Sequence, residues 1–380
     1  MKLRKTLLVI GCVFLGVVGY KFVAKFNCIP VFHGKDNAKI NRDLYWAAFY
    51  GNYRNVCTLI HEGADVNYNF RDDENKTPLY RAASHGDDRN LNSADKFALP
   101  NMEIMGTRLK VVELLIKRGA NVKAITTQGL TALHVAATKE IAEMLIKNGA
   151  VVDAQSFTGD GPTPLFKAVT RHKSVAEELI KYGANVNQTT SSGDTPLLHA
   201  TRAKNIGVVD LLIKRGADIN WKDNDSGTAL EFALQSNNNL IAQLLMEHGA
   251  VVSSKSELGL NEMHWAVMHN DLAMVGRILD KGGDVDPVSK DGRTPLMEAV
   301  INNNKDIAEF LIKHGANINF SSERNWHNRP ILFFAKDKEM LALLLSHGAN
   351  VKAVDSNGND IFYFLQGRTD LIEMVKNSGS

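Results

Sequence analysis

The chain of 380 residues is longer than one typical domain, and its composition is that of an ordinary globular protein. Hydrophobic residues make up 44% and charged residues 23%, which excludes a disordered or low-complexity chain, and 9 prolines and 3 cysteines exclude a collagen-like chain and a disulfide scaffold. The net charge of +2 is uneven, because residues 1–35 hold six basic side chains and no acidic one, leaving 38 basic against 42 acidic residues elsewhere. This slightly acidic remainder argues against nucleic acid as a partner, since that affinity depends on neutralising phosphates.

Residues 1–24 have the features of a membrane-targeting segment. Basic residues within 1–5 precede an apolar run from Thr6 to Tyr20. With residues 21–24 the run would span about 28 Å as a helix if the amine of Lys21 reaches the membrane interface. The basic flank predicts that the N-terminus stays inside and the body lies outside. We therefore expect a signal-anchor or transmembrane helix over 1–24, a tether over 25–42, and a body in the periplasm or another extracytoplasmic space.

Three other interpretations of this segment stay open. The small residues Val17, Val18 and Gly19 allow cleavage as a signal peptide, after which the body would be secreted. Cys12 follows a short apolar stretch that resembles a bacterial lipid-attachment motif. The segment could also be a buried helix of a cytosolic protein, although nothing that follows it in the sequence would bury it.

Internal repetition dominates the rest of the sequence. A phrase of the form Gly-Ala-Asp-Val-Asn recurs nine times between Gly63 and Gly348. The spacings between successive glycines are 56, 30 and 34 residues, followed by five spacings of 33. A second phrase, Thr-Pro-Leu or a close variant, follows most of these glycines, as at Thr195 and Thr294. Two phrases that recur in register predict a solenoid of stacked units.

Each recurring feature of a unit has a physical reason, as the unit around Thr195 illustrates. The threonine can cap a helix by accepting a hydrogen bond from an orphan amide, and Pro196 suits the first helical position. Ala200 lets neighbouring helices approach closely, while Leu212 belongs to the apolar face of a second helix. Gly216 suits a left-handed helix terminator. No single unit can bury its apolar face, so the units must stack.

This 33-residue period with its two phrases resembles the ankyrin repeat. The resemblance implies an all-α solenoid of about ten helix-turn-helix units with β-hairpin fingers over residues 43–380, after one N-terminal hydrophobic helix. The second unit carries an insertion at 87–107, and the units that begin near Thr126 and Glu323 each lack about three residues between their helices. The expected units are 43–67, 72–123, 126–153, 157–187, 190–220, 223–253, 257–286, 289–319, 323–352 and 355–380.

The sequence contains no motif of a known catalytic, phosphate-binding or calcium-binding site. It has 12 histidines, but His134 and His264 occupy the position of the structural histidine of the family. We therefore expect no catalytic residues, no cofactor, no metal and no small-molecule substrate.

The resemblance implies a non-enzymatic scaffold for protein–protein interaction, which binds a partner through the concave face of the first helices and the finger tips. In a cell envelope, such a scaffold could be an immunity protein, an inhibitor or a docking factor. The alternative function is a regulatory or accessory subunit of an envelope enzyme.

Candidate partner-binding residues lie at the ends of the first helices and at the finger tips. Among them, Lys139, Arg171 and Arg202 fall on three successive units and predict a basic track for a partner with an acidic strip. The competing interpretations are that these cations pair with nearby carboxylates and that the tryptophans pack on adjacent fingers. The other candidates are Gln235, Met268, His269 and Ile301 on the concave face and Trp221, Phe320 and Trp326 at the tips.

Overall fold

The computed structural model describes residues 37–84, 101–157, 161–252, 260–321 and 328–378. The expected hydrophobic helix over 1–24 lies outside these ranges. Among the helices within them, none has the length and apolar character needed to cross a membrane.

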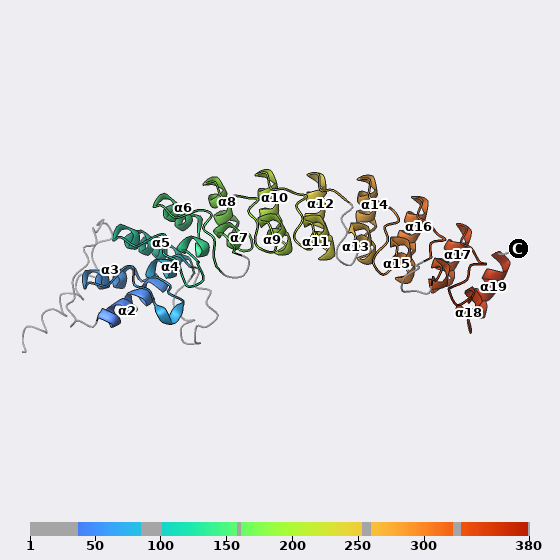
Figure 1. Cartoon of the computed structure of the whole chain (residues 1–380), viewed down its shortest axis with the longest axis horizontal. Coiled ribbons are helices and arrows are strands. Elements are labelled where there is room, and N and C mark those ends of the chain that lie inside the picture. Colours follow the sequence, from blue (N-terminus) through green and yellow to red (C-terminus); the bar gives the residue numbers. More distant parts are fainter. Residues whose placement is uncertain (1–36, 85–100, 158–160, 253–259, 322–327, 379–380) are drawn as a thin grey trace, which may run out of the picture.

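The described residues form ten helix pairs that stack side by side in one elongated row, with the first helix of each pair in one layer and the second in another (Figure 1). The first layer contains α2 (Asn37–Phe49), α4 (Pro78–Ala83), η3 (Ala132–Val135), α7 (Pro164–Ala168), α9 (Pro196–Arg202), α11 (Ala229–Gln235), α13 (Glu262–Met268), α15 (Pro295–Ile301), η4 (Ile331–Phe334) and α18 (Ile361–Phe364). The second contains α3 (Tyr53–His61), α5 (Asn101–Lys117), α6 (Lys139–Lys147), α8 (Lys173–Lys181), α10 (Ile206–Lys214), α12 (Asn239–Glu247), α14 (Leu272–Asp280), α16 (Lys305–Lys313), α17 (Lys338–Ser346) and α19 (Thr369–Ser378).

The unit around α9 confirms the local predictions. The side chain of Thr195 accepts a hydrogen bond from the amide of Leu198 at 3.3 Å, and Pro196 takes the first helical position, where an N–H would find no partner in the helix. Ala200 is fully buried. After α10, Gly216 has φ of +83°, a left-handed conformation that a side chain would disfavour and that ends the helix.

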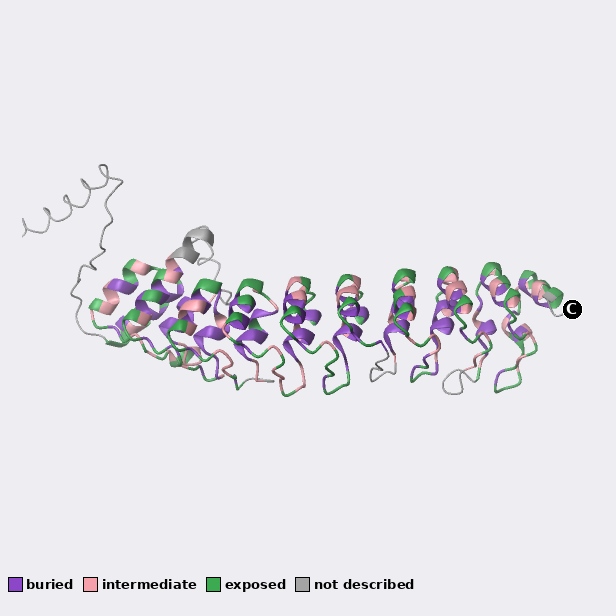
Figure 2. Cartoon of the chain, turned by 90° about the horizontal axis from the view of Figure 1, so that it is seen from above, coloured by how far each residue is buried: buried purple, intermediate pink, exposed green. Residues whose placement is uncertain are grey.

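The core runs between the two layers along the whole row (Figure 2). Buried leucines and isoleucines of the second helices, such as Leu212 and Ile241, face alanines and leucines of the first helices. Each unit contacts the next through helices of the same layer, as α9 does with α11 and α10 with α12. Burial therefore depends on stacking, as the repeat pattern predicted.

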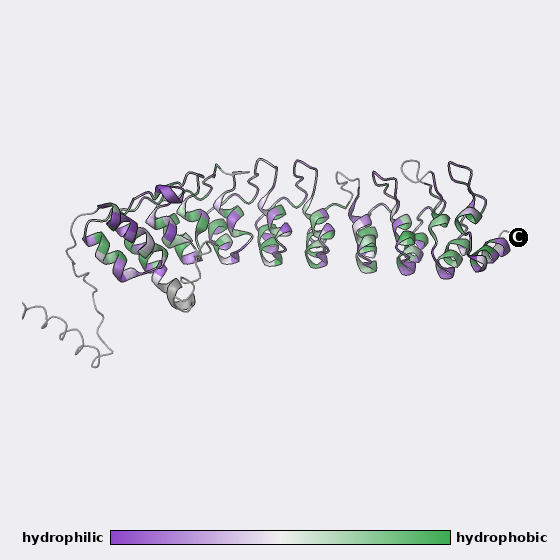
Figure 3. Ribbon diagram, turned by 90° about the horizontal axis from the view of Figure 1, so that it is seen from below, coloured by the Kyte–Doolittle hydropathy of each residue, from purple (hydrophilic) through white to green (hydrophobic). Residues whose placement is uncertain are grey.

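The expected β-hairpin fingers have turns rather than strands. The fingers lie along one edge of the row (Figure 3), and in the described part of the chain the only β-pairing consists of isolated bridges, such as Phe70 to Lys76. Asparagine side chains join the fingers instead. The side chain of Asn220 donates to the carbonyl of Gly249 at 3.2 Å and accepts from the amide of Val251 at 2.8 Å. These bonds satisfy backbone groups of the next unit without a ladder of strands.

Three boundaries differ from those expected. Helix α2 begins at Asn37, inside the tether predicted for 25–42, because Ile40 packs into the core and extends the helix. Helix α5 begins at Asn101, inside the insertion predicted for 87–107. The missing residues of the two short units shorten the first helix itself, so η3 and η4 are single 3₁₀ turns of four residues each.

Candidate functional site

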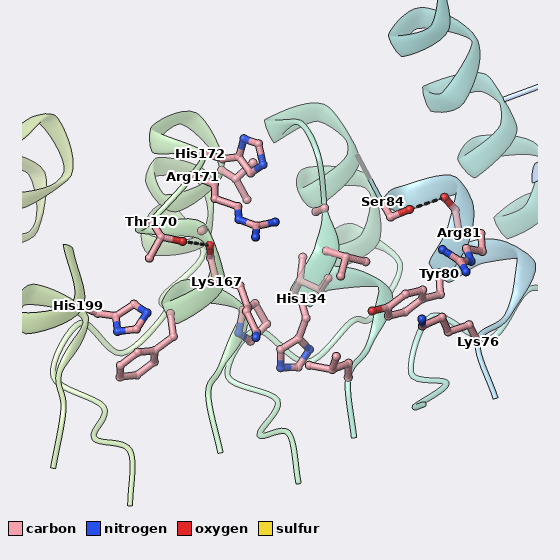
Figure 4. A pocket seen from close by; sticks show the side chains of 18 residues that line it. Lys76, Tyr80, Arg81, Ser84, His134, Lys167, Thr170, Arg171, His172 and His199 are labelled. Carbon is pink, nitrogen blue, oxygen red and sulfur yellow. Dashed lines mark hydrogen bonds between the residues drawn. The ribbon is translucent and has the colours of Figure 1, made fainter. Parts of the chain in front are cut away.

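The shortened third unit leaves a cavity of about 380 Å³ between its neighbours (Figure 4). Helices α4 and α7 flank η3, which is too short to fill the space between them. The amide of Ala137, just after η3, donates to the carbonyl of Ala83 at the end of α4 at 3.0 Å, so the shortened unit is held against the preceding one. The cavity is thus built into the stack by a local change of chain length.

One position of the repeat lines this cavity in four successive units. It lies four residues after the residue that precedes each first helix, a threonine in most units and Asn261 before α13, and its occupants over the row define what we call the inner row. In the cavity these are Arg81, Val135, Lys167 and His199. Farther along, the chemistry changes to aromatic and then acidic, with Phe232, Trp265 and Glu298.

The cavity wall is cationic. Lys76, Arg81, Lys167 and Arg171 line it, and no Asp or Glu does so among the described residues. Two of these cations have carboxylate partners: the amine of Lys76 lies 2.8 Å from Asp73 and 3.3 Å from Glu74, and Arg81 pairs with Asp73. Lys167 is exposed and makes no ion pair within the described ranges. The positive charge of Lys167 therefore faces an open cavity.

Asp73 and Arg81 belong to a buried network at the start of the stack. Both bind the hydroxyl of Tyr45, and the guanidinium of Arg81 also lies 5.1 Å from the ring centre of Phe49. Burial and the hydrogen bond to Asp73 raise the pKa of the Tyr45 hydroxyl, and hydrogen bonds from Lys76 and Tyr45 together with the charge of Arg81 hold the pKa of Asp73 low despite its burial. Arg81 is thus fixed in the wall, and the ion pair reduces its charge toward the cavity.

His134 forms the floor of the cavity and is held as a neutral imidazole. Its Nδ1 accepts from the amide of Thr131 at 3.0 Å, so its Nε2 carries the proton and donates to the carbonyl of Pro162 at 3.2 Å. Burial, with a contribution from the charge of Lys167, lowers the pKa of His134 to about 4. The ring therefore joins two units structurally, and both nitrogens are already engaged.

Protonation of His134 should make the stack sensitive to acid. The pKa of His134 is lower in the folded chain than in the unfolded chain. Below about pH 6.5, His134 therefore takes up a proton in the unfolded chain but not in the folded one. This contribution to stability is complete above that pH and is lost as the pH falls toward 4. The free energy of unfolding should decrease by about 2–3 kcal/mol more in the wild type than in a His134→Gln variant between about pH 7 and pH 4.5. Urea unfolding at both pH values measures this, and equal decreases would contradict the assignment.

Comparison with protein families identifies the repeat. The sequence matches the family model for ankyrin repeats (three copies) over residues 44–156, 102–190, 183–256, 234–322 and 263–355. The chain belongs to the ankyrin-repeat family. No curated protein matches the chain.

The basic track predicted for this ankyrin-repeat protein is not continuous. Lys139 does not end a first helix; it is the first residue of α6. The first helix of the third unit is shortened to η3, so the position that ends a first helix in other units begins the second helix here. Arg171 lies in the turn after α7 and lines the cavity, as an exposed side chain. The prediction is therefore wrong for the location of Lys139, whereas Arg171 lies beside the other cavity cations.

Arg202 ends α9 as predicted, but its charge is used within the ankyrin stack. Its guanidinium pairs with Asp194 and, at 2.8 Å, with Asp223 of the next unit, and it lies 4.0 Å from the ring centre of Phe232. The competing interpretation, that a track cation pairs with nearby carboxylates, is thus confirmed for Arg202. This residue joins units five and six.

Farther along the ankyrin stack, Gln235, Met268 and Ile301 are the last residues of α11, α13 and α15, as the repeat register predicted. Gln235 and Met268 are exposed and Ile301 is partly buried. His269 caps the end of α13, where its ring stacks on Trp265 and its Nε2 lies 3.3 Å from the carbonyl of Gln235. A binding role for these residues stays a prediction.

The finger-tip candidates differ in exposure. Trp221 is 37% exposed, and its indole N–H donates to the carbonyl of Gly193 in the preceding finger at 2.8 Å. Phe320 is partly buried against the core. Trp326 lies outside the residues that the structure describes. Trp221 is therefore anchored on its neighbour as the packing interpretation proposed, yet leaves ring surface in solvent.

Two features of this ankyrin stack were not predicted. Lys167 and His199 line the cavity from the inner row, whereas the predicted binding residues lie at the ends of the first helices and at the finger tips. Phe157, which is 72% exposed in a finger, was not among the tip candidates. The available signals were a lysine or histidine at the second position after the Thr-Pro-Leu phrase and an aromatic residue in a turn.

The described part of this ankyrin-repeat protein holds no cluster of metal-ligating side chains. No three histidine, cysteine, aspartate or glutamate side chains gather there in a way that could hold a metal ion. Its distinguishing surface feature is the cationic cavity followed by the aromatic part of the inner row.

Proposed function

We propose that this ankyrin-repeat protein is a non-enzymatic scaffold that binds a partner protein through its inner row and finger tips. Ankyrin repeats generally mediate protein–protein interaction. The observation that supports a specific partner surface is the cationic cavity over η3, which continues into the partly exposed rings of Phe232 and Trp265. Arginine and large aromatic residues contribute most to interface energies, and a cationic wall favours a partner with an acidic strip.

The scaffold is proposed to lie in the cell envelope, anchored by residues 1–24 with its body outside the cytoplasm. The charge and apolar pattern of those residues supports this topology.

Within the envelope, the proposed role is that of an inhibitor, an immunity protein or a docking factor. Each of these roles requires a rigid surface that covers part of another protein. The continuous core of the stack supplies rigidity, and charge complementarity would speed association with an acidic partner.

Cross-linking in intact cells tests both proposals. The full chain, tagged after Ser380, is cross-linked with a membrane-permeant or a membrane-impermeant reagent, purified and analysed by mass spectrometry. We expect both reagents to recover the same partner protein in stoichiometric amount. Recovery with the permeant reagent alone would overturn the location and leave the interaction standing. Recovery of no protein with either reagent would overturn the scaffold function.

A further inference from the structure

We propose that the cavity over η3 is a carboxylate-binding pocket, which seats an acidic peptide segment of the partner. This inference rests on the proposed scaffold function and adds the location and chemistry of one contact. The pocket spans several units, because Tyr80 reaches it from α4, His134 from η3 and His199 from α9 (Figure 4). An extended segment, rather than a single compact ion, matches this length.

Charge determines what the pocket accepts. Its lining contains four Lys and Arg side chains and no acidic one among the described residues, and Lys167 has no carboxylate partner there. Arg171 lies one helical turn beyond Lys167, on the same side of the pocket (Figure 4). Both side chains carry N–H donors, and charge-assisted hydrogen bonds from such cations to a carboxylate are stronger than neutral ones.

The apolar wall favours a side-chain carboxylate on a peptide. Phe166 is buried beneath the pocket with the ring of His199 against it, edge to face, at 5.9 Å between ring centres. Val135 contributes a partly buried aliphatic group. The methylene groups of a glutamate, or an aliphatic neighbour in the peptide, would bury apolar surface against this wall.

A phosphate group fits the same pocket less well. Phosphate sites commonly use free backbone amides at the start of a helix. Here α4 and α7 begin with Pro78 and Pro164, which have no N–H, and the amide of Tyr80 already donates to the side chain of Thr77 at 3.2 Å. The lining side chains Lys167 and Arg171 are donors that suit a carboxylate.

Peptide binding to the purified full chain tests the pocket. The probe is a short fluorescein-labelled peptide of glutamates around one leucine, and binding is followed by fluorescence polarisation. We expect saturable binding that weakens as salt rises from about 0.1 M to about 1 M, since the screening length falls from about 10 Å to about 3 Å. Lys167→Glu and Arg171→Glu should each weaken binding by about tenfold or more, because each places a like charge beside the carboxylate. Lys167→Arg should retain binding.

Lys139→Glu is the matched control. Lys139 is exposed, stands in the same position of its repeat phrase as Arg171, and does not line the pocket. We expect it to bind the peptide as the wild type does, and circular dichroism verifies that all variants fold. The proposal would be overturned if a glutamine peptide bound as tightly as the glutamate peptide, or if Lys139→Glu weakened binding as much as Lys167→Glu. Displacement of the peptide by inorganic phosphate at the same concentration as the peptide would also overturn it. So would capture of the cellular partner by Lys167→Glu at wild-type yield, a result that leaves the scaffold function intact.

Discussion

Replacing Leu212 by alanine should lower the free energy of unfolding of the central units by about 2–5 kcal/mol, the usual cost of a cavity at a buried leucine. Leu212 is fully buried in α10, which packs against both α8 and α12. Its removal therefore weakens the core on both sides of one unit. Because solenoid stability is approximately a sum over neighbouring units, we expect the loss to stay near α10.

Urea unfolding followed by circular dichroism measures the loss, and hydrogen exchange with mass spectrometry locates it. Leu240→Ala is the matched control, because Leu240 lies in the adjacent α12 and is 69% exposed. The control should change stability by no more than about 0.5 kcal/mol. Loss of all helical signal in one step at the wild-type urea concentration would contradict the prediction.

Arg202→Glu should destabilise the fifth and sixth units by about 1–3 kcal/mol, an estimate reduced for the partial exposure of the arginine. The substitution removes the charge that joins Asp194 to Asp223 and puts a third carboxylate beside them. Asp223 is buried, and its side chain also accepts from the amide of Gly227 at 2.8 Å, so the damage extends to the finger turn.

Lys214→Glu provides the comparison for Arg202→Glu. Lys214 lies in the same unit and pairs with Asp210 at 2.8 Å, but this pair is on the exposed surface of α10. Its reversal should change the free energy of unfolding by about 1 kcal/mol or less in urea unfolding. An equal effect of both substitutions would show that Arg202 does not join the units. If the prediction holds, reversal of Arg202 cannot be used as a probe of partner binding, because loss of binding would reflect loss of structure.

The local predictions succeeded where a single unit contains the whole cause. The capping threonine, the proline at the first helical position and the terminating glycine act through hydrogen bonds and backbone conformation within a few residues. The regular repeat therefore predicted the helices around Thr195 and Gly216 well. Prediction was poorer where the repeat is irregular, because the missing residues could be taken from a turn or from a helix. In the structure the first helix of the third unit is the shorter element, and Lys139 lies in the second helix of that unit rather than at the end of the first.

The sequence by itself determined the family, the stacking of ten units and the burial of their alanines and leucines, because these depend on a pattern repeated in every unit. Tertiary structure decided which charges are available to a partner. Arg202 and Lys167 are both cations in the first layer, but among the described residues only Arg202 pairs with carboxylates of two units. Tertiary structure also decided that the space over η3 stays open. The neighbouring units hold α4 and α7 apart, and η3 is too short to fill the space between them. Contacts between units, which no single repeat encodes, made the difference in both cases.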